Sequence, residues 1–189
     1  MKRLLCLMFA LLLLALPCAL AETDPSAHVD EDGETIDNPM HDVDSFEALQ
    51  AAVPGVVIAR PPEDANTVTY TWIHAEPVIA QIQFIWGEDF YTYRAAALPD
   101  SGEKADIDGL YLPFDEEESF TNLFEGEEDV LRVRSSTEEA YAVCDWVRAD
   151  LKTQYSLFSE TAGEPEMPII ELAATLMPVQ SAWAEDSDE

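Results

Sequence analysis

The sequence predicts an α+β domain: a twisted antiparallel β-meander of about six strands, with an N-terminal and a C-terminal helix packed on it. Two observations support this fold class. Stretches in the middle of the chain alternate apolar and polar side chains and are separated by turn residues, which is typical of strands with one buried face. Segments with helical spacing of apolar residues lie at both ends of this region.

The first predicted element is a helix that ends at Pro54-Gly55. Asp44 and, three residues later, Glu47 have the form of a capping box at its start. The apolar residues that follow fall on one face of the helix, which predicts a single buried stripe. This stripe consists of Phe46, Leu49 and Val53.

Strand patterns follow this helix. A short apolar run over 55–60 stops at two prolines, and 67–75 alternates with many β-branched and aromatic residues. The next stretch predicts a hairpin that turns at Gly87 and returns over 90–97. Before the turn one face should be the core face and the other should point outward. The core face holds Val78, Ala80, Ile82, Phe84 and Trp86, and the outward face holds Gln81 and Gln83.

Three further strands and a helix complete the predicted domain. The strands are expected over 130–134, 140–147 and 151–158. The closing helix begins near Pro168, a residue suited to a first helical turn, and stops at Pro178. Its apolar face comprises Ile169, Leu172, Ala173 and Leu176.

Residues 1–21 have the form of a secretory signal peptide. Two basic residues precede an apolar run over 4–16, and small residues mark a cleavage site after Ala21. The run is shorter than the roughly 18 apolar residues of a membrane span, so we expect a secreted or cell-surface chain with no membrane insertion after cleavage. A lipid anchor on Cys18 is the alternative, although Pro17 makes a poor lipidation signal.

The rest of the chain divides by composition. Residues 22–42 are acidic and nearly devoid of large apolar side chains, which predicts a disordered leader. Residues 181–189 are expected to be an acidic tail. Between them, 43–180 forms a single domain of ordinary size.

Charge excludes some classes of partner. The chain has 39 acidic and 9 basic residues and a net charge of -30, and loss of Lys2 and Arg3 with the signal peptide takes two positive charges away, giving -32. Such a chain repels nucleic acid and anionic membrane surfaces, while an unknown protein or a small ligand remains compatible with it. Cys144, the sole cysteine after the signal, lies in an apolar pattern and is expected to be a packed thiol.

Arg94 is the best single candidate for a binding role. It follows a tyrosine-rich strand, and the acidic pair Asp106 and Asp108 comes in the next connection. One interpretation is a guanidinium that binds a carboxylate on a peptide or small molecule. The other, which the acidity of the chain favours, is an ion pair with Asp106 or Asp108 that holds the connection to the sheet.

Other candidate sites are less specific. Tyr91 and Tyr93 could line a ligand groove, although core packing explains strand aromatics equally well. Calcium is compatible with the acidic turns around Gly33 and Gly109, but both fail the EF-hand spacing, so no metal site and no cofactor is predicted. The stretch 115–129 reads as a solvated loop or as a docking loop for a basic partner.

No catalytic residue is predicted. The sequence has no nucleophile elbow, no zinc-binding His-Glu-x-x-His and no phosphate-binding glycine loop. Asp145 is the one acid within a strongly apolar stretch, and the alternation of its strand predicts a surface position. An extracytoplasmic hydrolase with a loop-built active site stays open as an alternative.

Short motifs spread over the predicted domain carry a family resemblance. They are "NPM" (38–40), "SFEAL" (45–49), "AQIQF" (80–84), "YR" (93–94), "DIDG" (106–109), Trp146 and "YSL" (155–157). With them the chain resembles an uncharacterised family of secreted or lipid-anchored proteins of gut Firmicutes. It is also similar to a domain of unknown function at the extracytoplasmic end of some anti-sigma-factor and sporulation-related proteins. The resemblance implies an α+β fold and an extracytoplasmic address; we therefore expect a non-enzymatic binding or sensing module at the bacterial cell surface.

Overall fold

The computed structural model describes residues 28–29, 35–36, 38–121, 130–136, 141–160 and 166–176. The expected signal peptide, Cys18 and the expected acidic tail lie outside these residues. No helix in the described part of the chain is long and apolar enough to cross a membrane. The chain divides into two units, residues 1–38 and 39–189. In the first unit β1 (His28–Val29) pairs antiparallel with β2 (Thr35–Ile36).

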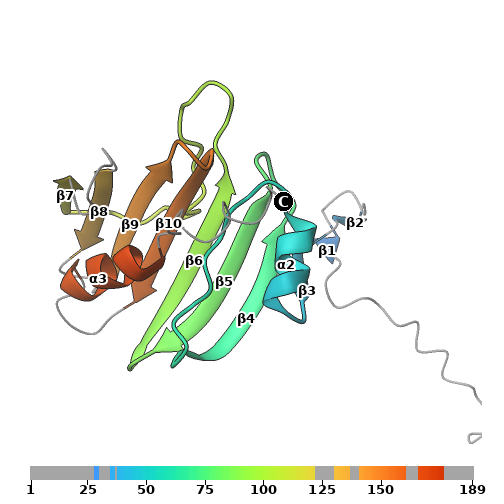
Figure 1. Ribbon diagram of the computed structural model, residues 1–189, viewed down its shortest axis with the longest axis horizontal. Helices are drawn as coiled ribbons and strands as arrows, with labels where there is room; N and C mark the ends of the chain where they lie inside the picture. Colours follow the sequence, from blue (N-terminus) through green and yellow to red (C-terminus); the bar gives the residue numbers. More distant parts are fainter. Residues whose placement is uncertain are drawn as a thin grey trace, which may run out of the picture. The chain divides into compact units, whose positions relative to one another are not determined.

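The second unit is built on an antiparallel sheet in which eight strands are described (Figure 1). The strands are β3 (Met40–Val43), β4 (Asn66–Ile73), β5 (Ile79–Trp86), β6 (Asp89–Ala97), β7 (Glu116–Thr121), β8 (Val130–Ser136), β9 (Tyr141–Arg148) and β10 (Thr153–Glu160). Their order across the sheet is β3-β4-β5-β6-β10-β9-β8-β7. The antiparallel sheet is thus confirmed, and the expectation of a simple meander of about six strands is wrong.

Two strands of the eight-stranded sheet, β3 and β7, were not predicted, because their sequences carry weak strand signals. β3 begins at Met40, inside the segment 22–42 that we expected to be a disordered leader, and β1 and β2 lie there too. β7 lies inside 115–129, which we expected to be a loop. Both β3 and β7 are edge strands rich in exposed polar residues, so neither needs the apolar alternation that identifies a half-buried strand.

The sheet consists of two four-stranded meanders that meet at β6 and β10. Phe90 to Ala97 pair with Thr153 to Glu160 across this junction. In the chain, however, β6 is followed by β7, which lies at the edge of the sheet beyond β10, β9 and β8. The connection 98–115 therefore has to pass β10, β9 and β8 before β7 begins.

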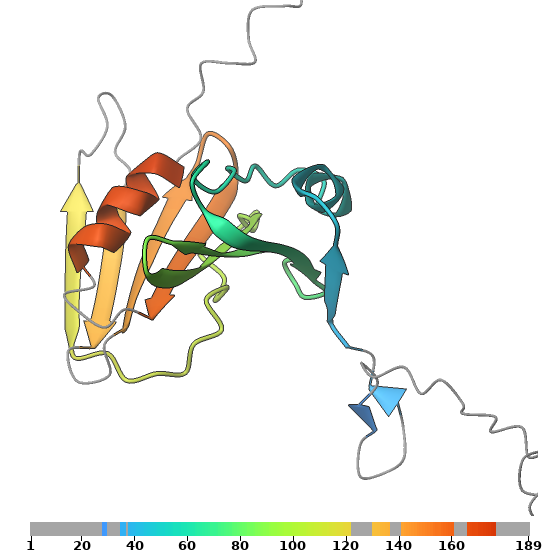
Figure 2. The same ribbon diagram turned by 90° about the horizontal axis from the view of Figure 1, so that it is seen from below.

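Two helices pack on one face of the sheet and the connection 98–115 runs along the other (Figure 2). The helices are α2 (Phe46–Ala52) and α3 (Glu166–Leu176). Both confirm the helices expected at the two ends of the domain. The capping box centred on Asp44 is wrong by one residue, because the side chain of Ser45 accepts the N–H of Ala48 at 3.1 Å and caps α2.

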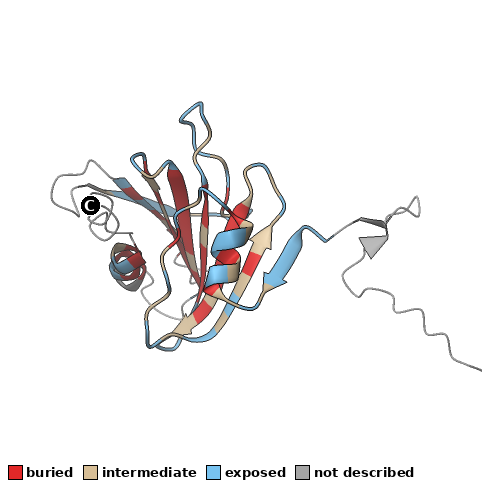
Figure 3. Ribbon diagram, turned by 45° about the vertical axis from the view of Figure 1, so that its right-hand side comes forward, coloured by how far each residue is buried: buried red, intermediate tan, exposed pale blue. Residues whose placement is uncertain are grey.

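The helices cover a continuous apolar core on their face of the sheet, which we call the core face. Its central strands are buried, whereas the outer side of α2 is exposed (Figure 3). Tyr93, Trp146 and Tyr155 form a stacked aromatic group, with the rings of Trp146 and Tyr155 5.1 Å apart. Such burial of large aromatic side chains supplies a major part of the hydrophobic stabilisation.

The apolar run 55–60 is not a strand, contrary to expectation. It crosses the core face after α2, where Ile58 is buried. The hydroxyl of Tyr155 donates to the carbonyl of Val57 at 2.8 Å, and the N–H of Val57 meets the hydroxyl of Thr153 at 3.5 Å. These two side chains satisfy the N–H and the carbonyl of Val57, which a neighbouring strand would otherwise have paired. The run is apolar because Ile58 is buried in the core, and it needs no strand for that.

Candidate functional site

The face opposite the helices, which we call the polar face, carries a row of polar side chains across six strands. Each member of this row pairs directly with the next in the strand register. The row consists of Thr71, Gln81, Arg94, Ser156, Asp145 and Arg132. Gln81 was expected to point outward, and it does face away from the core, but it is only 1% exposed.

The connection 98–115 buries part of this row. Ile107 is buried against Ile79 and Ala96 in a small apolar cluster. The side-chain amide of Gln154 accepts the N–H of Ala105 at 2.9 Å and donates to the carbonyl of Ala97 at 3.3 Å. The connection is therefore attached to the sheet by both apolar and polar contacts.

Arg94 is the central attachment of the connection. Its Nε donates to the Gln81 amide oxygen at 2.8 Å, and its Nη1 donates to the carbonyls of Ile107 and Asp108 at 3.1 and 2.6 Å. We expected an ion pair with Asp106 or Asp108 to do this, but the contacts are to backbone carbonyls. Burial lowers the pKa of Arg94, and the nearby carboxylates of Asp108 and Asp106 oppose that shift.

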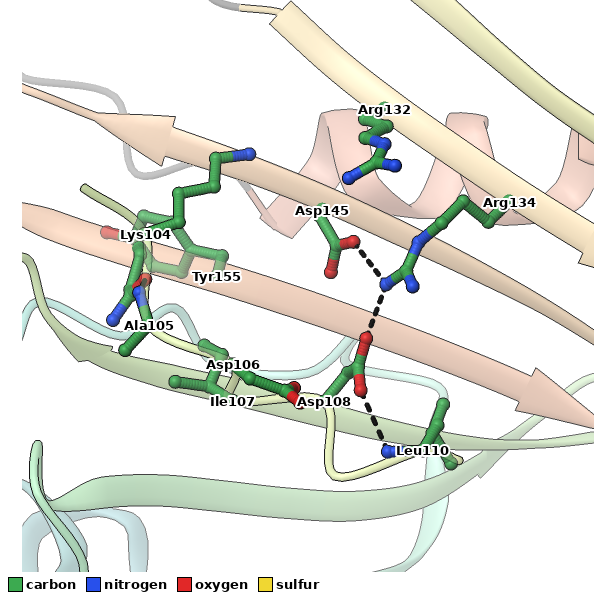
Figure 4. Close-up of a pocket in the computed structure, with 11 residues that line it drawn as sticks. Lys104, Ala105, Asp106, Ile107, Asp108, Leu110, Arg132, Arg134, Asp145 and Tyr155 are labelled. Atoms are coloured by element: carbon green, nitrogen blue, oxygen red, sulfur yellow. Dashed lines mark hydrogen bonds and ion pairs between the residues drawn. The ribbon is translucent and has the colours of Figure 1, made fainter. Parts of the chain in front are cut away.

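Arg134 joins two acidic side chains beneath the connection (Figure 4). Its Nη2 donates to Asp145 at 2.7 Å and also to the carboxylate of Asp108. Burial raises the pKa of Asp145, although Arg134 opposes this. Burial also disfavours the charged form of Asp108, but the N–H of Leu110 and the guanidinium of Arg134 outweigh it and lower the pKa of Asp108.

Arg134, Asp108 and Asp145 line a cavity of about 260 Å³, which we call the Lys104 cavity. Its charged side chains are Lys104, Asp106, Asp108, Arg132, Arg134 and Asp145. Arg132 forms a two-pronged ion pair with Glu117 at 2.8 and 2.9 Å. Lys104 makes no hydrogen bond or ion pair with any residue of the described part, and burial lowers its pKa.

A second cavity of about 220 Å³, the Arg94 pocket, lies on the other side of Asp108 and Leu110, which line both cavities. It has one cation, an apolar part and two acids, Asp108 near Arg94 and Glu160 at the far end. Its lining residues are Gln83, Phe90, Thr92, Arg94, Asp108, Leu110, Ser156, Phe158 and Glu160. The two cavities flank one turn of the connection and together form the candidate site.

The structure brings together three of the five candidate binding residues. Arg94 and Asp108 line the Arg94 pocket, and Asp106 and Asp108 line the Lys104 cavity. Tyr91 and Tyr93 lie on the core face instead, 1% and 0% exposed, and burial raises the pKa of both. Neither tyrosine lines the candidate site.

Several members of the site were not among the residues predicted from the sequence. Arg132 and Arg134 alternate with apolar residues in "VLRVR", which placed them on one face of a strand. What the pattern could not show was that β8 lies two strands from β10, so that both arginines meet the connection. Asp145 faces away from the core as expected, but its side chain is only 15% exposed because the connection and Arg134 cover it.

Cysteine and metal chemistry find no support at this site. Cys144 is buried on the core face, and burial raises its pKa, so the thiol stays protonated at neutral pH. Among the described residues no group of three or more His, Cys, Asp or Glu side chains is placed to hold a metal ion.

Comparison with known proteins adds no further identification. The chain matches no protein-family model, no curated protein and no solved structure.

The turn that divides the two cavities depends on Gly109. A Cβ at this position would lie 2.8 Å from Nη1 of Arg94, and its φ of 62° is unfavourable for other residues. We predict that Gly109→Ala lowers the free energy of unfolding by about 2–3 kcal/mol. Gly102→Ala is the matched control, since Gly102 has φ of 74° but no neighbour within 4 Å. Equal losses in urea denaturation would show that the Arg94 contact contributes nothing.

Arg134 neutralises two carboxylates that are 8% and 15% exposed. We predict that Arg134→Gln lowers the free energy of unfolding by about 3 kcal/mol near neutral pH, because both acids lose their counter-charge. Arg134 helps to lower the pKa of Asp108 and opposes the rise in the pKa of Asp145, so its removal shifts both pKa values upward in the folded state. The stability that Arg134 provides is present while the two acids are charged, so the loss should shrink as pH falls and they become protonated. Arg132→Gln, at an exposed ion pair, should cost under about 1 kcal/mol. A pH-independent loss at Arg134 would contradict this account.

Proposed function

We propose that this protein is a secreted, non-enzymatic binding module of the bacterial cell surface, and that its site takes a small ligand bearing a carboxylate. The observation that carries the proposal is the placement of the basic side chains. Only seven of the nine basic residues follow the signal peptide, and four of them, Arg94, Lys104, Arg132 and Arg134, line the two cavities. Four acids, Asp106, Asp108, Asp145 and Glu160, line the same cavities, so the lining is balanced in charge. In a chain with 39 acidic and 9 basic residues, such a surface repels an anion less than the rest of the chain does.

Two of these cations are not neutralised by a direct carboxylate contact. Arg94 donates to an amide oxygen and two carbonyls, and Lys104 contacts no acid within the described part. Arg94 is half-buried, and a cation in that position is costly unless a counter-ion is supplied. Lys104 is exposed, so its ammonium is accessible to a ligand. A ligand carboxylate would supply that counter-ion at the site.

The use that the described structure makes of Asp145 and Asp108 favours binding over hydrolysis. Asp145, whose pKa is raised by burial, is held by Arg134 rather than pointed at open space, and Asp108 is held by the same guanidinium. A general acid has to reach the leaving group of a substrate. Both acids are instead used in fixing the connection to the sheet.

The test is binding of simple carboxylates to the purified domain. We expect succinate and benzoate, but not succinamide or benzamide, to raise the melting temperature, because a ligand that binds only the folded form stabilises it. Lys104→Gln should weaken succinate binding by about fivefold or more, as expected for one charge-assisted contact. Lys152→Gln, at an exposed turn away from both cavities, is the control. No shift with any carboxylate, or equal effects of the two substitutions, would overturn the proposal.

A further inference from the structure

The Arg94 pocket has a layout that specifies its ligand more closely than charge alone. Nε and Nη1 of Arg94 are engaged by Gln81 and the connection, whereas Nη2 donates no hydrogen bond within the described part. The guanidinium is therefore fixed in place by two of its nitrogens and retains an unused donor. A donor held in this way suits a carboxylate, because little side-chain entropy is lost on binding.

The middle of the pocket is apolar and partly uncovered. Leu110 and Phe158 are half-buried, and Phe90 is 38% exposed, although all three line the same cavity. Thr92 and Ser156 lie between them and Arg94 and are almost fully buried. Such a surface next to a fixed cation fits an apolar group attached close to a carboxylate.

The far end of the pocket carries the opposite charge. Arg94 pairs with Ser156 and Phe90 pairs with Glu160, so the cation and the carboxylate are four residues apart along paired strands. That spacing corresponds to about 13 Å between their backbones. Glu160 is exposed, and its carboxylate makes no hydrogen bond or ion pair with a described residue. The pocket therefore offers a cation, an apolar wall and an anion in a line.

Resting on the binding function proposed above, we propose that the Arg94 pocket binds a short peptide with an apolar C-terminal residue. The peptide carboxylate lies on Nη2 of Arg94, the apolar side chain packs on Phe90, Leu110 and Phe158, and the free amino group faces Glu160. An extended chain rises about 3.5 Å per residue, so two or three residues span about 7–10 Å. The Arg94 and Glu160 side chains have to cover the remaining distance, which a free amino acid is too short to span.

The experiment is isothermal titration calorimetry of the wild-type protein with the tripeptide Ala-Leu-Phe. Its C-terminal amide tests the Arg94 contact without altering the protein, which is needed because Arg94 also holds the connection. Its N-acetyl form tests the Glu160 contact, and 3-phenylpropanoate supplies the same apolar group and carboxylate from a source that is not a peptide. The variants are Phe158→Ala and Glu160→Gln, with the exposed Glu63→Gln as the control.

We expect amidation to weaken binding by about tenfold or more, and Phe158→Ala by a similar factor. Glu160→Gln should weaken the free tripeptide severalfold but leave the N-acetyl form unchanged, and Glu63→Gln should change neither. Equal binding of acid and amide, or equal effects of Glu160→Gln on both forms, would overturn the peptide assignment. If 3-phenylpropanoate or succinate binds and the tripeptide does not, this inference fails and the carboxylate-binding function stands. If none binds, both fail.

Discussion

The pairing of β6 with β10 is the constraint on which the rest of the domain depends. Because the second meander attaches to the first through its last strand, β7 ends up at the far edge of the sheet. The chain leaving β6 must then cross three strands, and the helices already occupy the core face. The connection 98–115 is left with the polar face, and its contacts there create both cavities of the candidate site.

The two faces of the sheet have different roles. The core face holds stacked aromatic rings under α2, α3 and the segment 55–60, and it gives the domain its hydrophobic stabilisation. The cavities of the polar face are lined by four of the nine basic side chains of the chain, Arg94, Lys104, Arg132 and Arg134. Arg94 connects these roles, because it sits on a strand of the rigid core and fixes the turn around Gly109. A binding site on such a support needs little rearrangement when its ligand arrives.

Local patterns predicted the local structure well. The helix faces built on Leu49 and Leu172, the hairpin at Gly87 and the strands after 130 followed from spacing, because each depends on neighbours in sequence. The strand order did not, since antiparallel pairing carries no sequence code for which strand lies beside β6. This is why Arg94 could be singled out while Arg132, Arg134 and Lys104 could not be placed around it. Tyr91 and Tyr93 lie on the opposite face from Arg94 for a different reason, since side chains alternate along β6, and this alternation is visible in the sequence.

A disulfide cross-link measures the β6–β10 junction directly. Phe90 and Glu160 pair across it and both are exposed. Directly paired antiparallel residues are close enough for a disulfide bond, so the variant carrying Phe90→Cys and Glu160→Cys should form one under mild oxidation. A variant with Ala97→Cys and Val130→Cys, two exposed positions that a simple meander would bring together where β6 ends and β8 begins, should not. The reverse result would place β8 beside β6 and remove the crossing connection on which the site is built.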